Sequence, residues 1–252
     1  MSSTFTIIFM FTSTNQNIIF FLYERIFLCY NTSYNFILEG ILDMEKAEVK
    51  VGISGGTFDP IHHGHLIVAE QIRESMGLDK IIFIPSGTPP HKDNKRITPA
   101  EHRYRMAELA IGTNPHFEIS RIEVDRAGST YTVDTLTELK ALYGEQPGLY
   151  FITGADIIPE LQTWRHFERL FTLCDFIAVL RPGYKKDGFL REIENLKTSY
   201  RAKIHIVDAP LIGISSTIIR EQVKGGKSIK YLVPESVENY IHEKRLYMEY
   251  DY

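Results

Sequence analysis

From Val49 onward, short runs rich in β-branched and aromatic residues alternate with segments that have a helical repeat of apolar residues. The expected strands are residues 49–54, 80–85, 117–122, 149–153, 176–180 and 203–207. The expected helices are residues 64–76, 100–111, 133–143, 164–173, 187–196, 217–223 and 234–242. Thr98 and Glu101, with Pro99 between them, predict a capping box at the start of the second helix. Such an alternation indicates parallel strands joined by helical crossovers.

This pattern predicts an α/β fold of the Rossmann-like, doubly wound type, with one parallel sheet in a single domain that covers residues 44–252. Helices are then expected on both faces of the sheet. Ligands of such sheets bind beyond the carboxyl ends of the strands, near the point where the strand order reverses. Functional residues are therefore expected in the loops that follow strands, at residues 55–63, 86–97, 154–163, 181–186 and 208–216.

Residues 1–43 have a different composition and are expected to lie outside this domain. They contain seven of the fifteen phenylalanines and a single basic residue, Arg25. No Lys or Arg precedes the apolar stretch 6–11, and charged residues interrupt the stretch 18–29, so neither a secretory signal nor a membrane span is predicted. Two interpretations stay open: a disordered or untranslated segment, with Met44 as the true initiator, or an interfacial membrane anchor.

The first of these interpretations makes a direct prediction. A chain that begins at Met44 should fold and keep its activity, because no element of the expected sheet precedes Val49. Thermal unfolding and an activity assay of the shortened chain test this expectation. Loss of solubility or turnover would show that residues 1–43 contribute to the fold or to the site.

The overall charge and the cysteine content exclude several classes of protein. The chain has 28 basic and 32 acidic side chains, a formal charge of −4 and a pI of about 6.1. Nucleic-acid binding is not expected, since it normally requires a basic excess. Two cysteines, Cys29 and Cys174, are too few for a disulfide framework and fit a cytoplasmic location. No membrane partner is expected for residues 44–252, and a homodimer is compatible with the sequence.

The loop after the first expected strand combines glycines with a pair of histidines. Gly55 and Gly56, followed by Thr57, let the backbone approach a ligand closely, and a helix starts near His62 and His65. A helix N-terminus favours anions, and imidazoles three residues apart can both donate to phosphate oxygens. Two alternatives are a zinc site, for which no third ligand with familiar spacing is visible, and surface histidines that cap the helix.

A second candidate phosphate site is the segment 214–220, ISSTIIR. Its three hydroxyls, at Ser215, Ser216 and Thr217, precede an apolar run, as at a helix N-terminus. Helical side chains lean toward the N-terminus, so Arg220 can reach an anion held by the first turn. The alternative interpretation is a capped surface helix with a solvated arginine.

These segments resemble a known family of nucleotidyltransferases. The segment 55–65, GGTFDPIHHGH, is similar to the (H/T)xGH motif of enzymes that transfer AMP or CMP from a nucleoside triphosphate, and ISSTIIR is similar to their ISSTxxR motif. Four further segments are similar to those of bacterial nicotinate-nucleotide adenylyltransferases: PPHK at 89–92, STYTVDTL at 129–136, GAD at 154–156 and RPG at 181–183. The resemblance covers about residues 49–247.

The resemblance implies an enzyme that joins nicotinate mononucleotide to ATP, giving deamido-NAD and pyrophosphate in NAD biosynthesis. The mononucleotide phosphate attacks the α-phosphorus of ATP in line, so no protein nucleophile is expected. The enzyme must instead align two anions and disperse charge on the transferred group. Mg²⁺ is the implied cofactor, and it should bridge phosphates with few protein ligands because it keeps its waters.

The resemblance also implies a role for individual residues. The expected catalytic residues are His62, His65 and Arg220, with His65 stabilising the transition state. The expected ATP-binding residues are Gly55, Gly56, Thr57, Gly154, Asp156, Arg181, Ser216 and Thr217. Nicotinate mononucleotide is expected to bind at Lys92, Thr132 and Trp164, with the indole stacked on the pyridine ring. No residue is expected to bind the metal directly.

Several of these assignments have structural alternatives. Trp164 can pack in the core, Thr132 can cap the helix that follows it, and Lys92 can be an ordinary solvated lysine. The same chemistry can also act on nicotinamide mononucleotide or phosphopantetheine, and a non-catalytic nucleotide sensor can share the fold. The sensor is disfavoured because both histidines and Arg220 are present.

Overall fold

The computed structural model describes residues 49–89, 97–144, 147–180, 186–210 and 212–248. The chain divides into two units at Ala47, and every described residue belongs to the second, Glu48–Tyr252. Lys92 and Arg181 lie outside the described residues, as does the segment 1–43, so the assignments made for them stay predictions.

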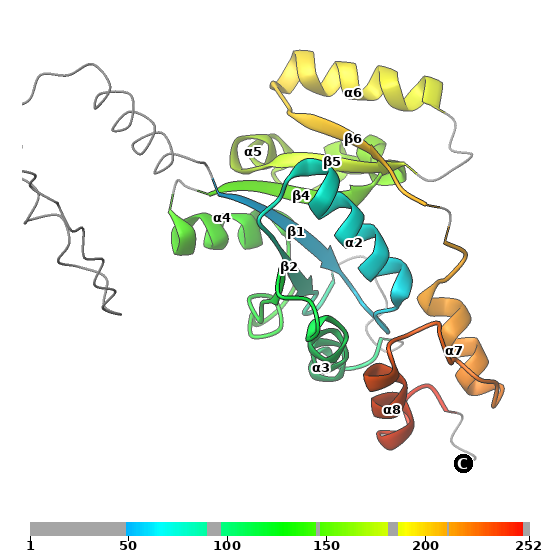
Figure 1. The fold of residues 1–252 in the computed structure, drawn as a ribbon. Helices are drawn as coiled ribbons and strands as arrows, with labels where there is room; N and C mark the ends of the chain where they lie inside the picture. Colours follow the sequence, from blue (N-terminus) through cyan, green and yellow to red (C-terminus); the bar gives the residue numbers. More distant parts are fainter. Residues whose placement is uncertain (1–48, 90–96, 145–146, 181–185, 211, 249–252) are drawn as a thin grey trace, which may run out of the picture. The chain divides into compact units, whose positions relative to one another are not determined.

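Six parallel strands form one sheet in the described part of the chain, in the order β3-β2-β1-β4-β5-β6 (Figure 1). They are β1 (Lys50–Gly56), β2 (Lys80–Pro85), β3 (Phe117–Ile119), β4 (Gly148–Gly154), β5 (Asp175–Leu180) and β6 (Ile204–Asp208). Ser54 of β1 is paired with Phe83 of β2 and with Ile152 of β4. The strand order reverses between β1 and β4, where sheets of this type bind their ligands. The predicted Rossmann-like, doubly wound fold is confirmed.

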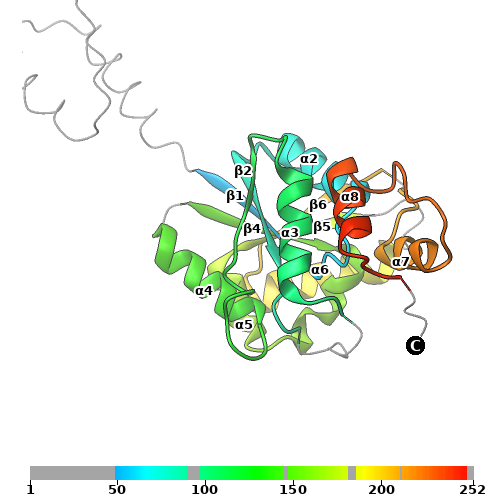
Figure 2. The ribbon, with the colours of Figure 1, turned by 90° about the horizontal axis from the view of Figure 1, so that it is seen from below.

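Helices cover both faces of the sheet (Figure 1, Figure 2). They are α2 (His63–Met76), α3 (Ala100–Ile111), α4 (Thr132–Tyr143), the 3₁₀ helix η2 (Ala155–Thr163), α5 (Phe167–Leu173), α6 (Lys186–Tyr200), α7 (Ser216–Lys224) and α8 (Glu235–Glu243). Apolar residues of α2, α3, α7 and α8 share one buried cluster, and those of α4, η2, α5 and α6 share the other. The two motifs therefore enter helices on the same face.

The central strands are buried on both faces, which explains their nearly continuous apolar sequences. In β5, Phe176, Ala178 and Leu180 pack in the cluster beneath α4, α5 and α6. Ile177 and Val179 point the other way and pack beneath α2, α3, α7 and α8. Successive side chains of a strand point to opposite faces of the sheet. A central strand with helices packed on both faces therefore requires apolar residues at every position.

Four predicted elements differ clearly from the structure. The helix expected at 187–196 is α6, which runs to Tyr200. The strand expected at 117–122 ends at Ile119, since Ile122 falls in a turn closed by a hydrogen bond from Asp125 N–H to the Arg121 carbonyl (2.9 Å). The segment after β4, expected to be a loop, is the 3₁₀ helix η2, and α5 begins only at Phe167 instead of Trp164. Short segments of this kind contain too few turns for the apolar repeat to fix their type or their ends.

The predicted capping box before α3 does not form. Pro99, not Thr98, is the N-cap, and no side chain caps the helix. Thr98 has other partners: its N–H donates to Asp59 Oδ2 (3.2 Å), and its carbonyl accepts from Arg103 Nε (2.8 Å). The residue before the N-cap of α3 is thus held by the distant carboxylate of Asp59 and by Arg103 of α3 itself.

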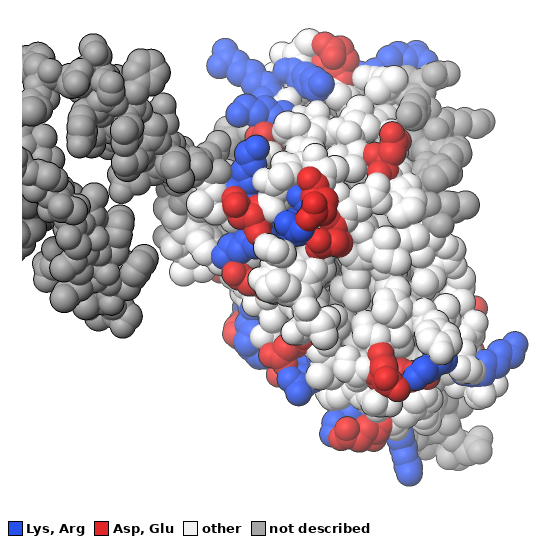
Figure 3. All heavy atoms as spheres, viewed as in Figure 1, with Lys and Arg blue, Asp and Glu red and all other residues white. Residues whose placement is uncertain are grey.

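Basic and acidic side chains lie next to each other on the face of the molecule drawn in Figure 3. Ion pairs among the described residues include Lys80–Glu118 and Arg121–Glu101, each at 2.9 Å. Exposed pairs of this kind contribute little to stability, because water and salt screen the charges. None of the described helices is both long and apolar enough to cross a membrane.

Candidate active site

The two sequence motifs meet at the carboxyl end of the sheet. Ser216 Oγ, in the first turn of α7, donates to the carbonyl of Pro60 in the loop between β1 and α2 (2.9 Å). Arg220 Nη1 donates to the carbonyl of Asp59 in the same loop (2.7 Å). Arg220 is therefore held by the first motif, and its interpretation as a solvated surface residue is wrong. The two motifs therefore lie close together, as a shared phosphate site requires.

The N-terminus of α7 is built as expected for an anion site. Ser215 is the N-cap, and its side chain accepts from the Ile218 N–H (3.3 Å). Arg220 reaches back over the first turn, where Nη2 donates to Thr217 Oγ1 (3.4 Å). The N–H groups of Ser216 and Thr217 have no acceptor within the helix because of their position. A guanidinium and helix-terminal amides thus lie together beside the first motif.

The histidine pair stacks at the start of α2. The rings of His62 and His65 are nearly parallel, with centroids 3.7 Å apart, and the rings of Phe58 and His65 are nearly perpendicular, with centroids 5.1 Å apart. The N–H of His62 donates to Nδ1 of His65 (3.2 Å). Since Nδ1 is an acceptor, the proton of neutral His65 lies on Nε2. The backbone thereby selects the tautomer in which Nε2–H is a donor.

His62 is a neutral imidazole at physiological pH. Its side chain is buried, and this burial lowers the pKa of His62 to about 4. Nδ1 of the ring is buried and has no hydrogen-bond partner among the described residues. Gly64 leaves the space for this ring, because a Cβ at Gly64 would lie 2.9 Å from Nδ1 and 3.0 Å from Cε1 of His62. Packing therefore explains the glycine of the HxGH sequence.

The amides at the start of α2 are less available than the sequence suggests. The N–H of His63 donates to the carbonyl of Leu232, in the segment before α8 (3.0 Å). The N–H of His62 is bonded to the His65 ring, as described above. The His63 N–H is therefore not open to a ligand. The imidazoles and the first turn of α7 are the stronger anion-binding groups.

The predicted nucleotide-binding glycines lie on the two strands where the strand order reverses. Gly55 and Gly56 are the last residues of β1, and Gly154 is the last residue of the neighbouring strand β4. Asp156 follows in the first turn of η2 and is exposed. A Cβ at Gly154 would lie 2.3 Å from Asp156 Oδ1, so glycine lets this carboxylate fold against the end of β4.

The two described candidates for the nicotinate side lie on neighbouring segments. Thr132 is the first residue of α4 and not its cap, because the N-cap is Tyr131. Trp164 follows η2, is partly buried, and meets the ring of Phe151 edge to face (centroids 6.0 Å). The guanidinium of Arg165 lies 4.6 Å from the Tyr131 ring centroid and links the two segments. Core packing thus accounts for part of the indole surface.

Comparison with known proteins agrees with this geometry. Residues 53–222 match the model of the cytidylyltransferase-like family. A probable nicotinate-nucleotide adenylyltransferase of Thermoanaerobacter sp. (strain X514) is 51% identical over 204 residues, which cover 81% of this chain and 96% of that relative. The chain belongs to the nicotinate-nucleotide adenylyltransferase family. The resemblance inferred from the motifs is confirmed.

Other members of the family are similar over the same share of the chain. A probable nicotinate-nucleotide adenylyltransferase of Moorella thermoacetica is 50% identical over 198 residues, or 79% of this chain and 91% of that relative. Among solved structures, the nicotinic acid mononucleotide adenylyltransferase of Plasmodium falciparum, complexed with NaAD, has a TM-score of 0.65 at 24% identity. The match covers 79% of this chain and 97% of that chain, and it supports the fold.

A buried arginine that joins loops at the candidate site was not predicted from the sequence. Arg103 of α3 is 1% exposed, and its guanidinium donates to the carbonyls of Thr57 (2.8 Å), Gly87 (2.9 Å) and Thr98 (2.8 Å). It therefore ties the loop after β1 to the loop after β2. The sequence did contain an indication of this burial. Arg103 is three residues before the apolar Met106, so both lie on the buried face of α3.

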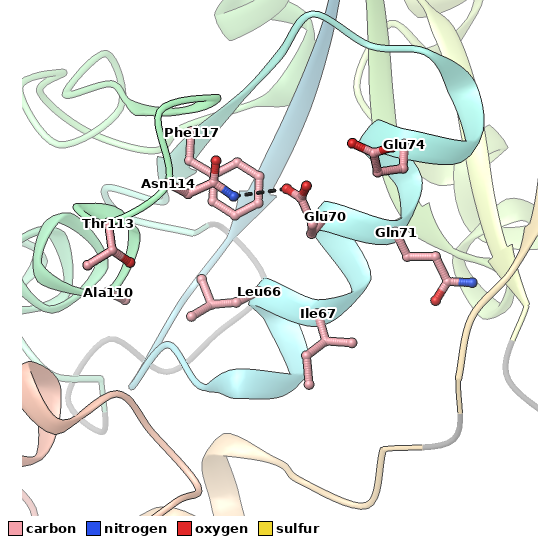
Figure 4. A pocket seen from close by; sticks show the side chains of 9 residues that line it. All are labelled: Leu66, Ile67, Glu70, Gln71, Glu74, Ala110, Thr113, Asn114 and Phe117. Carbon is pink, nitrogen blue, oxygen red and sulfur yellow. Dashed lines mark hydrogen bonds between the residues drawn. The ribbon is translucent and has the colours of Figure 1, made fainter.

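A hollow of about 490 Å³ lies elsewhere, between α2 and the end of α3 (Figure 4). Leu66, Ile67 and Phe117 form its apolar part, and Glu70 bonds to Asn114 across it (2.9 Å). None of the site residues predicted from the sequence lines it. The candidate site is therefore assigned from the convergence of the motifs and not from the size of a cavity.

Proposed function

We propose that the protein transfers the AMP moiety of ATP to nicotinate mononucleotide, forming deamido-NAD and pyrophosphate, and that it works in the cytoplasm. The observation that carries this proposal is the pair of hydrogen bonds from Ser216 and Arg220 to the loop of the first motif. These bonds bring two helix N-termini and a guanidinium to one place. A triphosphate needs such a constellation, because its charge is spread over many oxygens.

In the proposed reaction, a phosphate oxygen of the mononucleotide forms a bond to the α-phosphorus of ATP as the bond to the β-phosphate oxygen breaks. The Nε2–H of His65 donates to the α-phosphate, where negative charge develops. His62 is neutral and supports the stacked ring of His65. Arg220 and the first turn of α7 hold the β- and γ-phosphates and favour the departure of pyrophosphate.

Magnesium forms part of the same proposal. Phosphate oxygens and water suit Mg²⁺ better than imidazole, so the ion is expected to arrive on the triphosphate and to offset its charge. Among residues that the structure describes, no three His, Cys, Asp or Glu side chains form a group that could hold a metal. The exposed carboxylate of Asp156 is assigned instead to the ribose hydroxyls of ATP, at the end of β4.

A helix N-terminus favours the acid over the amide as second substrate. Thr132 and Val133 open α4, and their N–H groups have no acceptor within the helix. The positive end of a helix dipole stabilises an anion by roughly 0.3–1 kcal/mol, and the neutral carboxamide of nicotinamide mononucleotide lacks the negative charge that the carboxylate of nicotinate would place there. Trp164 is proposed to stack on the pyridine ring, and Lys92 to contact the mononucleotide phosphate.

Turnover with matched substrates tests this proposal. Deamido-NAD and pyrophosphate should form from ATP and nicotinate mononucleotide, and nicotinamide mononucleotide should react much more slowly. A clear preference for the amide would overturn the assigned acceptor. Binding of ATP without release of pyrophosphate with any acceptor would favour a nucleotide sensor.

Arg220→Ala should raise the activation barrier for the use of ATP by about 1.5–3 kcal/mol, the scale of a hydrogen bond to a charged group. The expected change appears in kcat/KM for ATP, measured at saturating nicotinate mononucleotide. Arg220→Lys should recover only part of the loss, because an ammonium lacks the planar fork of a guanidinium.

The matched control for this prediction is Arg105→Ala. Arg105 is an exposed arginine of α3 that pairs with Glu108, far from both motifs in sequence. Its removal should leave kcat/KM unchanged. If Arg220→Ala behaves like this control, Arg220 holds the loop of the first motif but does not act on the phosphates.

A further inference from the structure

Asp59 connects the first motif to three distant segments. Its side chain is buried in the loop between β1 and α2. Oδ2 accepts from the Thr98 N–H (3.2 Å), and Oδ1 accepts from the hydroxyl of Tyr247 (2.7 Å). The main-chain carbonyl of the same residue accepts from Arg220 (2.7 Å). Whatever fixes the carboxylate of Asp59 therefore also fixes the acceptor that orients Arg220.

Tyr247 comes from the end of the described chain, beyond α8. The N–H of Leu246, the residue before it, donates to the carbonyl of Ile241 (2.9 Å). The Tyr247 ring lies against α3, with its hydroxyl 3.9 Å from Met106 Sδ. Burial raises the pKa of Tyr247, so the hydroxyl keeps its proton and acts as a donor. A short O–H···O bond to a carboxylate is among the stronger hydrogen bonds in proteins.

We infer that Tyr247 is a positioning residue for the ATP site, acting through Asp59 on the loop of the first motif and on Arg220. This inference rests on the proposed function, which gives Arg220 its role on the β- and γ-phosphates. The C-terminal segment then does more than pack against α3. It sets the position of the phosphate-binding groups on the ATP side and leaves the nicotinate side, on α4 and η2, unaffected.

A second tyrosine provides a matched comparison. Tyr240 of α8 also donates or accepts a hydrogen bond on α3, at Nδ1 of His102 (2.9 Å). It joins α8 to α3, the helix against which Tyr247 also lies. Neither Tyr240 nor His102 has a bond to Asp59 or Arg220 among the contacts of the described residues. A purely structural role of the C-terminal segment would make the two tyrosines equivalent.

The test compares Tyr247→Phe with Tyr240→Phe in the full-length protein. Tyr247→Phe leaves Oδ1 of Asp59 without its donor, and KM for ATP should rise roughly tenfold, while KM for nicotinate mononucleotide changes by less than about twofold. Tyr240→Phe should change neither KM. Equal changes in both KM values, or equal effects of the two variants, would overturn the positioning role.

Binding of α,β-methylene ATP separates this inference from the proposed function, because that analogue cannot lose pyrophosphate. In the absence of an acceptor substrate, calorimetry should show that the analogue binds Tyr247→Phe roughly tenfold more weakly than the wild type. A wild type that binds the analogue but does not convert nicotinate mononucleotide would refute the function and keep the inference. If Tyr247→Phe does not fold, Asp59→Asn should weaken analogue binding, and unchanged binding there would refute the positioning role.

Discussion

His65→Ala is expected to lower kcat by roughly 10²- to 10³-fold, the loss that follows removal of one preorganised donor from a developing negative charge. The donor is Nε2–H, and the backbone N–H of His62 holds the ring in that tautomer through a 3.2 Å bond to Nδ1. The fold should survive, because His65 is only partly buried. Steady-state kinetics and circular dichroism of the variant measure the two expectations separately.

His63→Ala is the control for this change. His63 lies between the stacked pair in sequence, and its structural contact is made by its backbone N–H, which alanine keeps. Turnover of His63→Ala should stay near that of the wild type. Near-normal turnover of His65→Ala would remove that imidazole from the mechanism, and equal losses in both variants would indicate a general disturbance of the helix start.

The sheet, and the edge at which it binds a ligand, were predictable because the spacing of apolar residues along the sequence depends directly on which faces of a strand or helix are buried. A sheet covered on both faces needs apolar strands, as in β5, and such strands stand out between amphipathic helices. The motif residues were predictable for a related reason. Ligands bind at the loops after strands, and His65 and Arg220 lie near the N-termini of the helices that follow two such loops, so both were found by position as well as by resemblance.

Contacts between distant segments could not be predicted in the same way. The bonds from Ser216 to Pro60 and from Tyr247 to Asp59 join residues 156 and 188 positions apart. No local pattern encodes such a pairing, since each partner has several geometrically possible neighbours. The burial of His62, which lowers its pKa to about 4, arises from the same tertiary packing and was equally hidden.

Gly64→Ala should reduce kcat by roughly 10²-fold, because displacement of a reacting group by about 1 Å is sufficient for a loss of that size. The backbone at Gly64 is helical and permits alanine, and the exchange alone would stabilise an exposed helix by roughly 1 kcal/mol. The obstacle is the ring of His62, only 2.9 Å from the new Cβ. Moving this ring also moves His65, which stacks on it.

Gly64→Ala should therefore lose activity without a matching loss of stability. A second glycine serves as the control. Gly188 of α6 has open space where a Cβ would be added, so Gly188→Ala should gain up to about 1 kcal/mol of unfolding free energy with unchanged turnover. Gly64→Ala should show a nearly unchanged unfolding free energy, because the helix gain and the clash with His62 oppose each other, together with the large loss in kcat. Full activity of Gly64→Ala would show that the imidazole stack tolerates displacement, and the preorganised donor at His65 would then lose its structural basis.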